Sequence, residues 1–425
     1  MMYDASPSSR GGRTCGNLNL LPEVAAPPPF LRHWALDMRG VKGGVMRLSM
    51  LSAALVAALV GYGSTIALVL AAAAALNATP DQTASWVLAI CLTKAAGSAL
   101  LSTSTRIPMV LAWSTPGAAL IAATSDLTMA EGVGAFVGAG LLIALTGAVK
   151  PFGRAVSLIP DGIAAGMLAG VLLPFCLKGP GAAQSLGLNA LPMIAVFVLV
   201  RLKNPSLAVL AALATGLVAT ILTGTALPKL TLPWPHLTFI APAFRTGSVL
   251  GLALPLYLVT MASQNLPGFA TLRAAGYTPP VRPALVTTGA MSAIAALFGS
   301  HTVSMAAITT AICLGDDVHP DRSQRWKVGL AYAGVWIALG LLSPVIITGL
   351  QALPQGLMTL LVALALAGPL TGALTGAMAH PGTRFAAVIT LAVTASGTSA
   401  FGIGAAFWGL IAGLALHASS KSAKP

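Results

Sequence analysis

Charged residues are scarce in this chain of 425 residues. Asp, Glu, Lys and Arg make up 8% of it, whereas a soluble globular domain carries about 25%. Almost none of the expected helices has a charged face to turn toward water, and this excludes a soluble helical core. In contrast, 56% of the residues are hydrophobic and the mean hydropathy is +0.86. Most of the chain must therefore lie in a lipid bilayer.

Residues that bind metals or catalyse reactions are also few. The six histidines and ten acidic residues place no carboxylate pair, no metal-ligand cluster and no base beside a nucleophile in any expected span. The four cysteines have neither paired nor metal-ligand spacing and are expected to be free thiols. The sequence has no P-loop motif. We therefore expect no enzyme activity, no cofactor, no metal and no ATP-driven transport by this chain alone.

Long apolar runs are abundant instead. Runs of about 20 residues, each long enough to cross a bilayer, recur from Leu48 to Leu416. We count fourteen spans, roughly at residues 47–76, 82–103, 107–124, 130–149, 160–177, 187–200, 205–226, 246–266, 282–299, 302–315, 326–350, 355–377, 384–399 and 402–418. The predicted fold class is an all-α membrane protein with fourteen transmembrane segments.

The basic residues indicate how these spans are oriented. Lys and Arg are enriched in the cytoplasmic loops of membrane proteins. With the N-terminus placed in the cytoplasm, most of the 23 basic residues fall on the inner side, and the C-terminus is cytoplasmic too. The exceptions are Lys178, Lys229 and Arg245 outside, and Lys94 within a span. The net charge of +13 follows from this loop bias, so we expect no nucleic-acid partner.

The two ends of the chain differ from the membrane part. Residues 1–46 include three consecutive prolines at 27–29 and show no periodic apolar face. They also lack the apolar core of about 7–15 residues that a secretory signal peptide needs. We interpret them as a disordered cytoplasmic N-tail, with a regulatory or membrane-surface element as the alternative, and 419–425 as a cytoplasmic C-tail. Met46 or Met50 is an alternative natural start, because the membrane part begins there.

Two short stretches look like broken transmembrane segments. They are Arg106–Gly117 and Phe298–Met305, about half a chain apart. Each opens extended, breaks at Pro or Gly, and continues as an apolar helix. Paired interruptions in the two halves of a chain point to a transporter's binding site, and a broken helix at membrane depth is tolerated only in protein or along a cavity. The pattern predicts a carrier whose ligand lies between the two breaks.

A weak internal repeat accompanies the breaks. The stretches Leu158–Gly162 and Ala352–Gly356 each open an apolar helix with a proline, and their separation is close to that of the two breaks. Seven spans in each half is an odd number, so the second half would enter the membrane from the opposite side. The sequence therefore predicts a 7+7 inverted repeat, with coincidence among Gly- and Pro-rich segments as the alternative.

Several stretches resemble one protein family. Trp-Ser-Thr-Pro-Gly at residues 113–117 and Ser-Gln-Asn-Leu-Pro-Gly at residues 263–268 are the most specific motifs. The stretches that carry the likeness are Ala112–Leu120, Leu254–Gly268, Ala274–Tyr277, Ala306–Cys313, His319–Asp321 and Ala405–Gly413. In them the chain resembles the bacterial benzoate transporters, often called benzoate/proton symporters. The likeness runs from about Leu48 to Leu416.

The resemblance implies the fourteen-span fold of nucleobase and sulfate-type anion carriers. In that fold spans 1–4 and 8–11 form a core, or transport, domain, which here corresponds to 47–149 and 246–350. Spans 5–7 and 12–14 form a gate domain, here 160–226 and 355–418, which often mediates homodimerisation. Spans 3 and 10 each begin as a short strand and continue as a helix, in agreement with the breaks described above.

Two facing helix N-termini would then make an anion site. Each has free N–H groups and partial positive charge, so a carboxylate can bind without a buried arginine. We expect its hydrogen bonds to come from the backbone of Thr115–Gly117 and Val303–Met305. Hydroxyl donors would come from Ser114, Thr115, Thr302 and Ser304. The alternative is that these hydroxyls only cap the two half-helices.

Two amides and one histidine complete the polar part of this site. Gln264 and Asn265 lie in apolar sequence where related nucleobase carriers have an acidic residue, and an amide can donate to a carboxylate that an acid would repel. Packing between helices is their alternative role. His301 is the only histidine expected inside a core-domain span, and we predict it as a ligand donor and proton-coupling residue. Its alternative is a neutral histidine satisfied by carbonyls.

The remaining assignments concern aromatic and charged residues. Trp113 and Tyr62 are expected to form walls for an aromatic ring, with packing as the alternative. Lys94 departs from the resemblance and is costly inside a span; it would attract the anion, line a vestibule, or bond to carbonyls. The predicted substrate-binding residues are Tyr62, Trp113, Ser114, Thr115, Gly117, Gln264, Asn265, His301, Thr302 and Ser304.

The sequence as a whole predicts a secondary transporter in the bacterial inner membrane. It would import benzoate or a related aromatic carboxylate, by proton symport through alternating access. The alternative is an anion exchanger or a channel-like conductor for other small anions. Helix-dipole sites accept many carboxylates, so the sequence leaves the cargo, the proton stoichiometry and the homodimer open.

Overall fold

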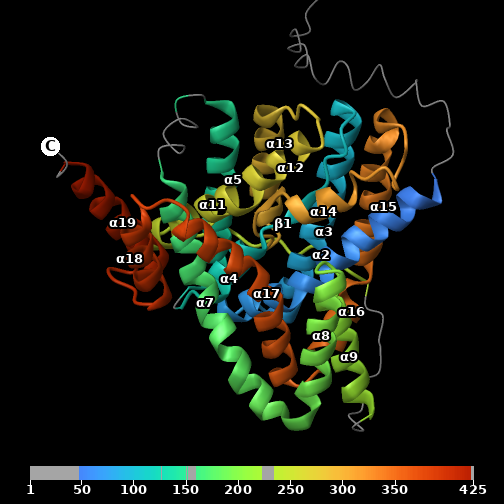
Figure 1. The fold of residues 1–425 in the computed structure, drawn as a ribbon, viewed down its shortest axis with the longest axis horizontal. Coiled ribbons are helices and arrows are strands. Elements are labelled where there is room, and N and C mark those ends of the chain that lie inside the picture. The colour runs from blue at the N-terminus through green and yellow to red at the C-terminus, as the bar shows by residue number, and fades with distance from the viewer. Residues whose placement is uncertain (1–46, 126, 150, 152–158, 223–233, 423–425) are drawn as a thin grey trace, which may run out of the picture. The chain divides into compact units, whose positions relative to one another are not determined.

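Apolar helices account for most of the described chain (Figure 1). The computed structural model describes residues 47–125, 127–149, 151, 159–222 and 234–422. The expected N-tail, 1–46, and the last residues of the C-tail, 423–425, lie outside the described residues, and so do the basic residues at 150, 154 and 229.

The first half of the chain contains the first of two strands. Its elements are α2 (Leu48–Ala75), α3 (Pro80–Thr105), β1 (Leu111–Trp113), α4 (Thr115–Ala122), α5 (Met129–Ala148), α7 (Asp161–Leu186), η2 (Gly187–Asn189), α8 (Ala190–Lys203) and α9 (Ala208–Leu222). Capping boxes begin α3 and α5: the hydroxyls of Thr79 and Thr128 accept from the backbone of Gln82 and Glu131, whose side chains accept in return.

The second half contains the other strand. Its elements are α10 (Thr246–Ser248), η3 (Val249–Ala253), α11 (Leu254–Thr260), η4 (Met261–Asn265), α12 (Leu266–Ala274), α13 (Val281–Ala296), β2 (Val303–Met305), α14 (Ala307–Ile312), η5 (Arg322–Lys327), α15 (Val328–Leu341), α16 (Ser343–Gln351), α17 (Gln355–Met378), α18 (Arg384–Ala395) and α19 (Ala405–Ser422). The segments η3 and η4 are π-helical turns, and Pro255 and Pro267 lie just after them. Such turns are frequent at functional sites.

Helix lengths bear on the predicted span count. Among the described residues, six helices are long and apolar enough to cross a membrane, or seven if η5–α15 and α16, bent by 57°, form one span. The remaining predicted spans correspond to shorter helices or to strand–helix segments, so the count of fourteen stays a prediction. One boundary differs: α7 continues to Leu186, past the expected end at residue 177, with Pro174 and Pro180 inside it.

The helices pack in two groups. In the first, which we call the strand group, α5 packs on α13, α3 on α15, and α2 on both α4 and α15. In the second, which we call the α17 group, α17 and α18 pack on α7, α19 packs on α18, and α8 packs on α9. Figure 1 shows α17 beside α7. The division into core and gate domains stays a prediction.

The two strands pair with each other inside the strand group. They are antiparallel, with Leu111 opposite Met305, Ala112 opposite Ser304, and Trp113 opposite Val303. All six residues are buried. The sequence prediction of two extended segments that continue as helices is confirmed here, since α4 and α14 follow the strands directly.

Similar local features lead the chain into each strand. Arg106 ends α3 in the left-handed conformation, with φ of 57°, and Gly299 lies at φ of 90° before β2, where glycine is favoured. Serines of the preceding helices then hold the strands. The Ser98 hydroxyl accepts from the Leu111 N–H at 2.9 Å, and the Ser292 hydroxyl accepts from the Val303 N–H at 3.0 Å.

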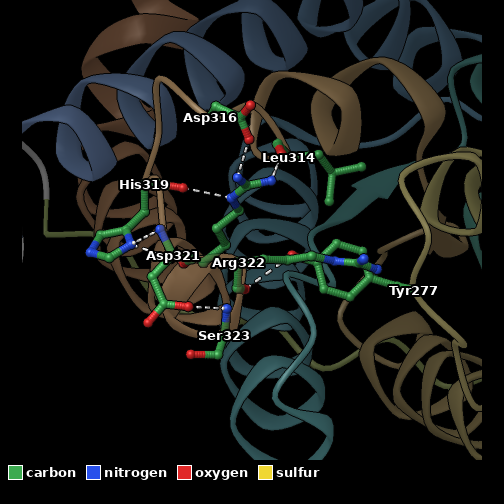
Figure 2. A network of polar contacts seen from close by, with 8 residues as sticks. Tyr277, Leu314, Asp316, His319, Asp321, Arg322 and Ser323 are labelled. Carbon is green, nitrogen blue, oxygen red and sulfur yellow. Dashed lines mark hydrogen bonds and ion pairs between the residues drawn. The ribbon is translucent and has the colours of Figure 1, made fainter.

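The loop before α15 is fixed by one arginine. The buried guanidinium of Arg325 donates to the carbonyls of His319 and Leu314 and pairs with the Asp316 carboxylate (Figure 2). Beside it the Asp321 carboxylate caps η5, and hydrogen bonds from Ser323 hold the pKa of this carboxyl below its usual value. The loop is therefore held by its own internal hydrogen bonds and one ion pair.

We predict that Arg325→Met destabilises the fold. Loss of the guanidinium leaves the buried Leu314 carbonyl and the part-buried His319 carbonyl without their donor, and should cost about 1–3 kcal/mol of unfolding free energy. Thermal unfolding in detergent measures this loss. Asp316→Asn is the matched control, because its side chain is 91% exposed and exposed ion pairs contribute about 0–1 kcal/mol. Equal losses in the two variants would contradict this account of the loop.

Candidate functional site

A cavity of about 720 Å³ lies where the two broken segments meet the α17 group. Its volume falls in the range of small-molecule sites, about 300–1,000 Å³. The strand group contributes residues from α2, β1, α4, η4 and the start of α14, and the other group contributes residues from α7, α8, α9 and α17. The walls are mainly apolar, with a few hydroxyls and one charge of each sign among the described lining residues.

Hydroxyl groups join the two breaks behind this cavity. Thr260 of α11 donates to the Ser114 hydroxyl at 2.9 Å and lies 3.0 Å from the Thr302 hydroxyl. Ser114 also caps α4 by accepting from the Gly117 N–H at 3.1 Å. The chain of hydroxyls therefore fixes the start of α4 relative to the residues before β2.

The second break is held by an amide. Asn265, fully buried in η4, accepts from the Met305 N–H through its Oδ1 at 2.9 Å. With Ser292 on the Val303 N–H, both of these strand amides already have partners within the protein. The start of α14 differs, since Ala306 provides no side-chain cap and residues 306–309 line the cavity. This arrangement differs from the expectation that the amides of 303–305 would face the ligand.

Three of the residues predicted for the site line the cavity. They are Trp113, Thr115 and Gln264. The others lie behind the wall or beside it: Tyr62, Ser114, Gly117, Asn265, His301, Thr302 and Ser304. The two neighbouring amides point different ways, as consecutive residues of a helix do: Gln264 faces the cavity, while Asn265 faces β2.

His301 is packed within the strand group. Its side chain is fully buried, and its Nδ1 accepts from the indole N–H of Trp86 at 3.0 Å. The Nε2 atom has no hydrogen-bond partner among the described residues. The imidazole is therefore fixed on one side, and the cavity lining does not include it.

An aromatic cluster lies against the cavity wall. The Tyr62 and Trp113 rings are 5.6 Å apart, and Trp336 of α15 lies 5.9 Å and 5.5 Å from them, centroid to centroid. Of these three only Trp113 lines the cavity, and its indole N–H donates to the Gly61 carbonyl at 3.3 Å. The buried ammonium of Lys94 packs against two of these rings.

Sequence reasoning missed the charged residues of the cavity. Arg201 of α8 is the only cationic side chain among its described lining residues, and Asp161 of α7 is the only acidic one. Neither has an ion-pair partner within the described part of the chain. Arg201 is half-buried, and its guanidinium lies 3.4 Å from where a Cβ at Gly368 of α17 would be. A basic residue near a helix end looks in sequence like any other topology signal, so nothing marked Arg201 as part of a cavity.

Two solved structures are similar to this chain in fold. The transmembrane domain of a cyanobacterium bicarbonate transporter, BicA, aligns with a TM-score of 0.57 at 13% identity, over 87% of this chain and 98% of that one. The inward-facing murine Slc26a9 anion transporter aligns with a TM-score of 0.56 at 15% identity, over 94% and 73%. The fold class is thus that of a membrane transporter similar to these anion carriers.

Sequence comparison gives the family. The chain belongs to the benzoate membrane transport protein (BenE) family, whose profile matches residues 44–419. It is 40% identical over 366 residues to the inner membrane protein YdcO of Escherichia coli, covering 85% of this chain and 93% of that protein. It is 32% identical over 369 residues to the benzoate membrane transport protein of Acinetobacter baylyi, covering 86% and 94%. The family resemblance read from the motifs is confirmed.

We predict that Asn265→Ala loosens the second break. Without the side-chain oxygen the buried Met305 N–H loses its acceptor, at a cost of about 1–3 kcal/mol. Thermal unfolding in detergent should show the loss. Ser263→Ala is the control, because Ser263 lines the cavity and donates only to the Val259 carbonyl of its own helix. If both variants unfold at the same temperature, Asn265 does not hold β2.

Proposed function

We propose that this chain is a secondary active transporter that imports benzoate or a related aromatic carboxylate together with a proton. Membership in the family and the transporter fold support transport. The observation that carries the proposal for the cargo is the cavity itself. It combines apolar walls with hydroxyls, one guanidinium (Arg201) and one carboxylate (Asp161) at the meeting of the two broken segments.

An aromatic carboxylate matches both parts of this lining. The ring would pack on apolar residues of the wall, with the Trp113 indole as its aromatic partner. The carboxylate would bind the Arg201 guanidinium, which can donate two parallel hydrogen bonds, or the Thr115 hydroxyl across the cavity. Gln264 would donate from its side-chain amide.

The other residues predicted for the site would support the cavity wall from behind, without touching the ligand. Ser114, Gly117, Asn265, Thr302 and Ser304 would keep the two breaks in the shape that the ligand requires, through the bonds described above. Tyr62 would support the Trp113 wall by ring packing at 5.6 Å. His301, the proton-coupling residue predicted from the sequence, is outside the described lining, so it is only one of two candidates for that role, the other being the buried Lys94.

Transport would follow from movement of the strand group against the α17 group. The cavity is lined by both groups, so relative movement would expose it to one side of the membrane and then the other. In this proposal the strand group is the core domain and the α17 group is the gate domain, through which two copies would associate. The proposed location is the bacterial inner membrane, as for the related protein YdcO.

A second proposal is anion exchange or conduction. The similar solved structures include a bicarbonate transporter and a protein titled as an anion transporter. Proteoliposome uptake separates the proposals: symport requires an inward proton gradient and no counter-anion, whereas exchange requires an anion on the opposite side. Accumulation that ignores the pH gradient would reject symport.

We predict that purified protein is stabilised by benzoate and its analogues, but not by uracil or sulfate. A ligand at a hundred times its Kd raises the unfolding free energy by about 2.7 kcal/mol, so a thermal-shift panel detects it. Benzamide is the matched control, because it keeps the ring and removes the negative charge. Equal stabilisation by benzoate and benzamide would show that the site does not read a carboxylate, and no shift with any aromatic acid would reject the cargo class.

We predict that Arg201→Gln raises the KM for benzoate uptake roughly tenfold or more, because a hydrogen bond to a charged partner contributes about 1.5–3 kcal/mol. The maximal rate should change less. Initial uptake rates in proteoliposomes measure both quantities. Lys203→Gln is the control, since Lys203 is exposed two residues further along α8 and is outside the cavity lining. Similar KM values for the two variants would place the carboxylate elsewhere.

A further inference from the structure

Lys94 is a fully buried cation site within the strand group. It lies in α3, with no accessible surface, and its ammonium has no hydrogen-bond partner among the residues that the structure describes. The Nζ atom lies 2.9 Å from the ring centroid of Trp336 and 4.0 Å from that of Trp113. Lys94 therefore touches aromatic rings where a buried lysine normally has an acid or carbonyls.

The groups around this ammonium provide no fixed negative charge. Cys91 lies one turn earlier on α3, and Tyr62 of α2 packs on the same two indoles. His301, before β2, is near enough to interact electrostatically with Lys94, and Tyr332 of α15 stacks on Trp336 at 5.8 Å. All four are neutral in their ordinary forms, and no described carboxylate pairs with Lys94.

One layer of rings separates this ammonium from the cavity. Trp113 touches Lys94 with its ring and also lines the cavity. Trp336 lies 3.6 Å from where a Cβ at Gly61 would be, and Gly61 is a lining residue too. Asp161 and Arg201 line the same cavity with one charge of each sign, so a bound anion would add a negative charge on the far side of this ring layer from Lys94.

This geometry links two binding events. Aromatic faces favour a cation, yet an ammonium buried without a counter-ion is unfavourable. A carboxylate in the cavity supplies the missing charge, so it favours the protonated lysine. By linkage the protonated lysine favours the carboxylate to the same extent. Opposite charges about 10 Å apart at an effective dielectric of 20 give roughly tenfold coupling.

We propose that Lys94 is the residue that couples proton uptake to anion binding in this transporter. The neutral Lys94 amine gains one proton, which originates in water on the side of the membrane to which the cavity is open, as the carboxylate binds. The resulting ammonium returns that proton to water on the other side when the carboxylate leaves. One proton therefore accompanies each anion, and no other group is consumed. This inference rests on the proposed symport of an aromatic carboxylate.

The test compares three variants in proteoliposomes. Lys94→Met should keep exchange of labelled for unlabelled benzoate, with affinity near pH 6 lowered about tenfold, and should lose accumulation driven by a pH gradient. Lys94→Arg stays charged at all working pH values, so its benzoate affinity should no longer change between pH 6 and 8. His301→Gln should keep gradient-driven accumulation, whereas its loss in that variant alone would assign coupling to His301.

A second readout separates coupling from a packing role. Benzoate added to wild-type protein in weakly buffered detergent solution should remove about one proton per site, and Lys94→Met should remove none. Lys94→Gln serves if the methionine variant does not purify as a monodisperse protein. Gradient-driven accumulation and proton uptake that persist in the neutral variants would overturn the proposal. If wild-type protein fails to bind benzoate or to respond to pH, the proposed function itself fails instead.

Discussion

The β1–β2 pair is the constraint on which the rest of the structure depends. Lipid offers no hydrogen bonds, so every backbone group of an interrupted membrane segment needs a partner within the protein. Here the strands pair with each other, and side chains of α3, α13, α15 and η4 satisfy what remains. Ser98 and Ser292 hold the first residue of each strand, and the Tyr332 hydroxyl donates to the Leu111 carbonyl at 2.9 Å. These buried polar side chains thus bond to the backbone of the two interrupted segments.

The same constraint decides what is left for a ligand. Because Ser114 caps α4 and Asn265 satisfies β2, these residues shape the cavity from behind its wall. Among the groups that line it are Thr115, whose hydroxyl shares a 2.7 Å hydrogen bond with the Thr65 hydroxyl, Gln264, and the start of α14, which has no side-chain cap. Arg201 reaches the same space from the α17 group, so a bound anion would contact both moving parts.

The sequence predicted the breaks but not the facing of the residues around them. Proline and glycine interrupt apolar runs visibly, so both strand–helix segments were located from sequence. The direction in which each side chain points is harder to predict. These helices are apolar on all sides, so they have no amphipathic stripe to indicate which side meets which neighbour. Gln264 and Asn265 point different ways, as neighbours on a helix do, but only the packing decides which of them meets the cavity and which meets β2. Arg201 and Asp161 come together only through the packing of α7 and α8 around one space.

The two halves of the chain share their helix pairings but not their charged residues. In the predicted inverted repeat, α3 is equivalent to α13, and α5 is equivalent to α15. The two most extensive helix pairings of the strand group are α3 with α15 and α5 with α13. These two pairings are therefore equivalent to each other under the repeat. Such a scaffold gives two equivalent ways of packing, as alternation between two sides of a membrane requires. The charges do not follow this equivalence. Asp161 corresponds to the neutral Gln355 in the repeat. Lys94 of α3 is the only fully buried lysine among the described residues, so no second buried lysine matches it in the other half. In the proposed transport cycle the repeated frame would supply the movement, and the charges that the repeat does not share would decide which ions move with it.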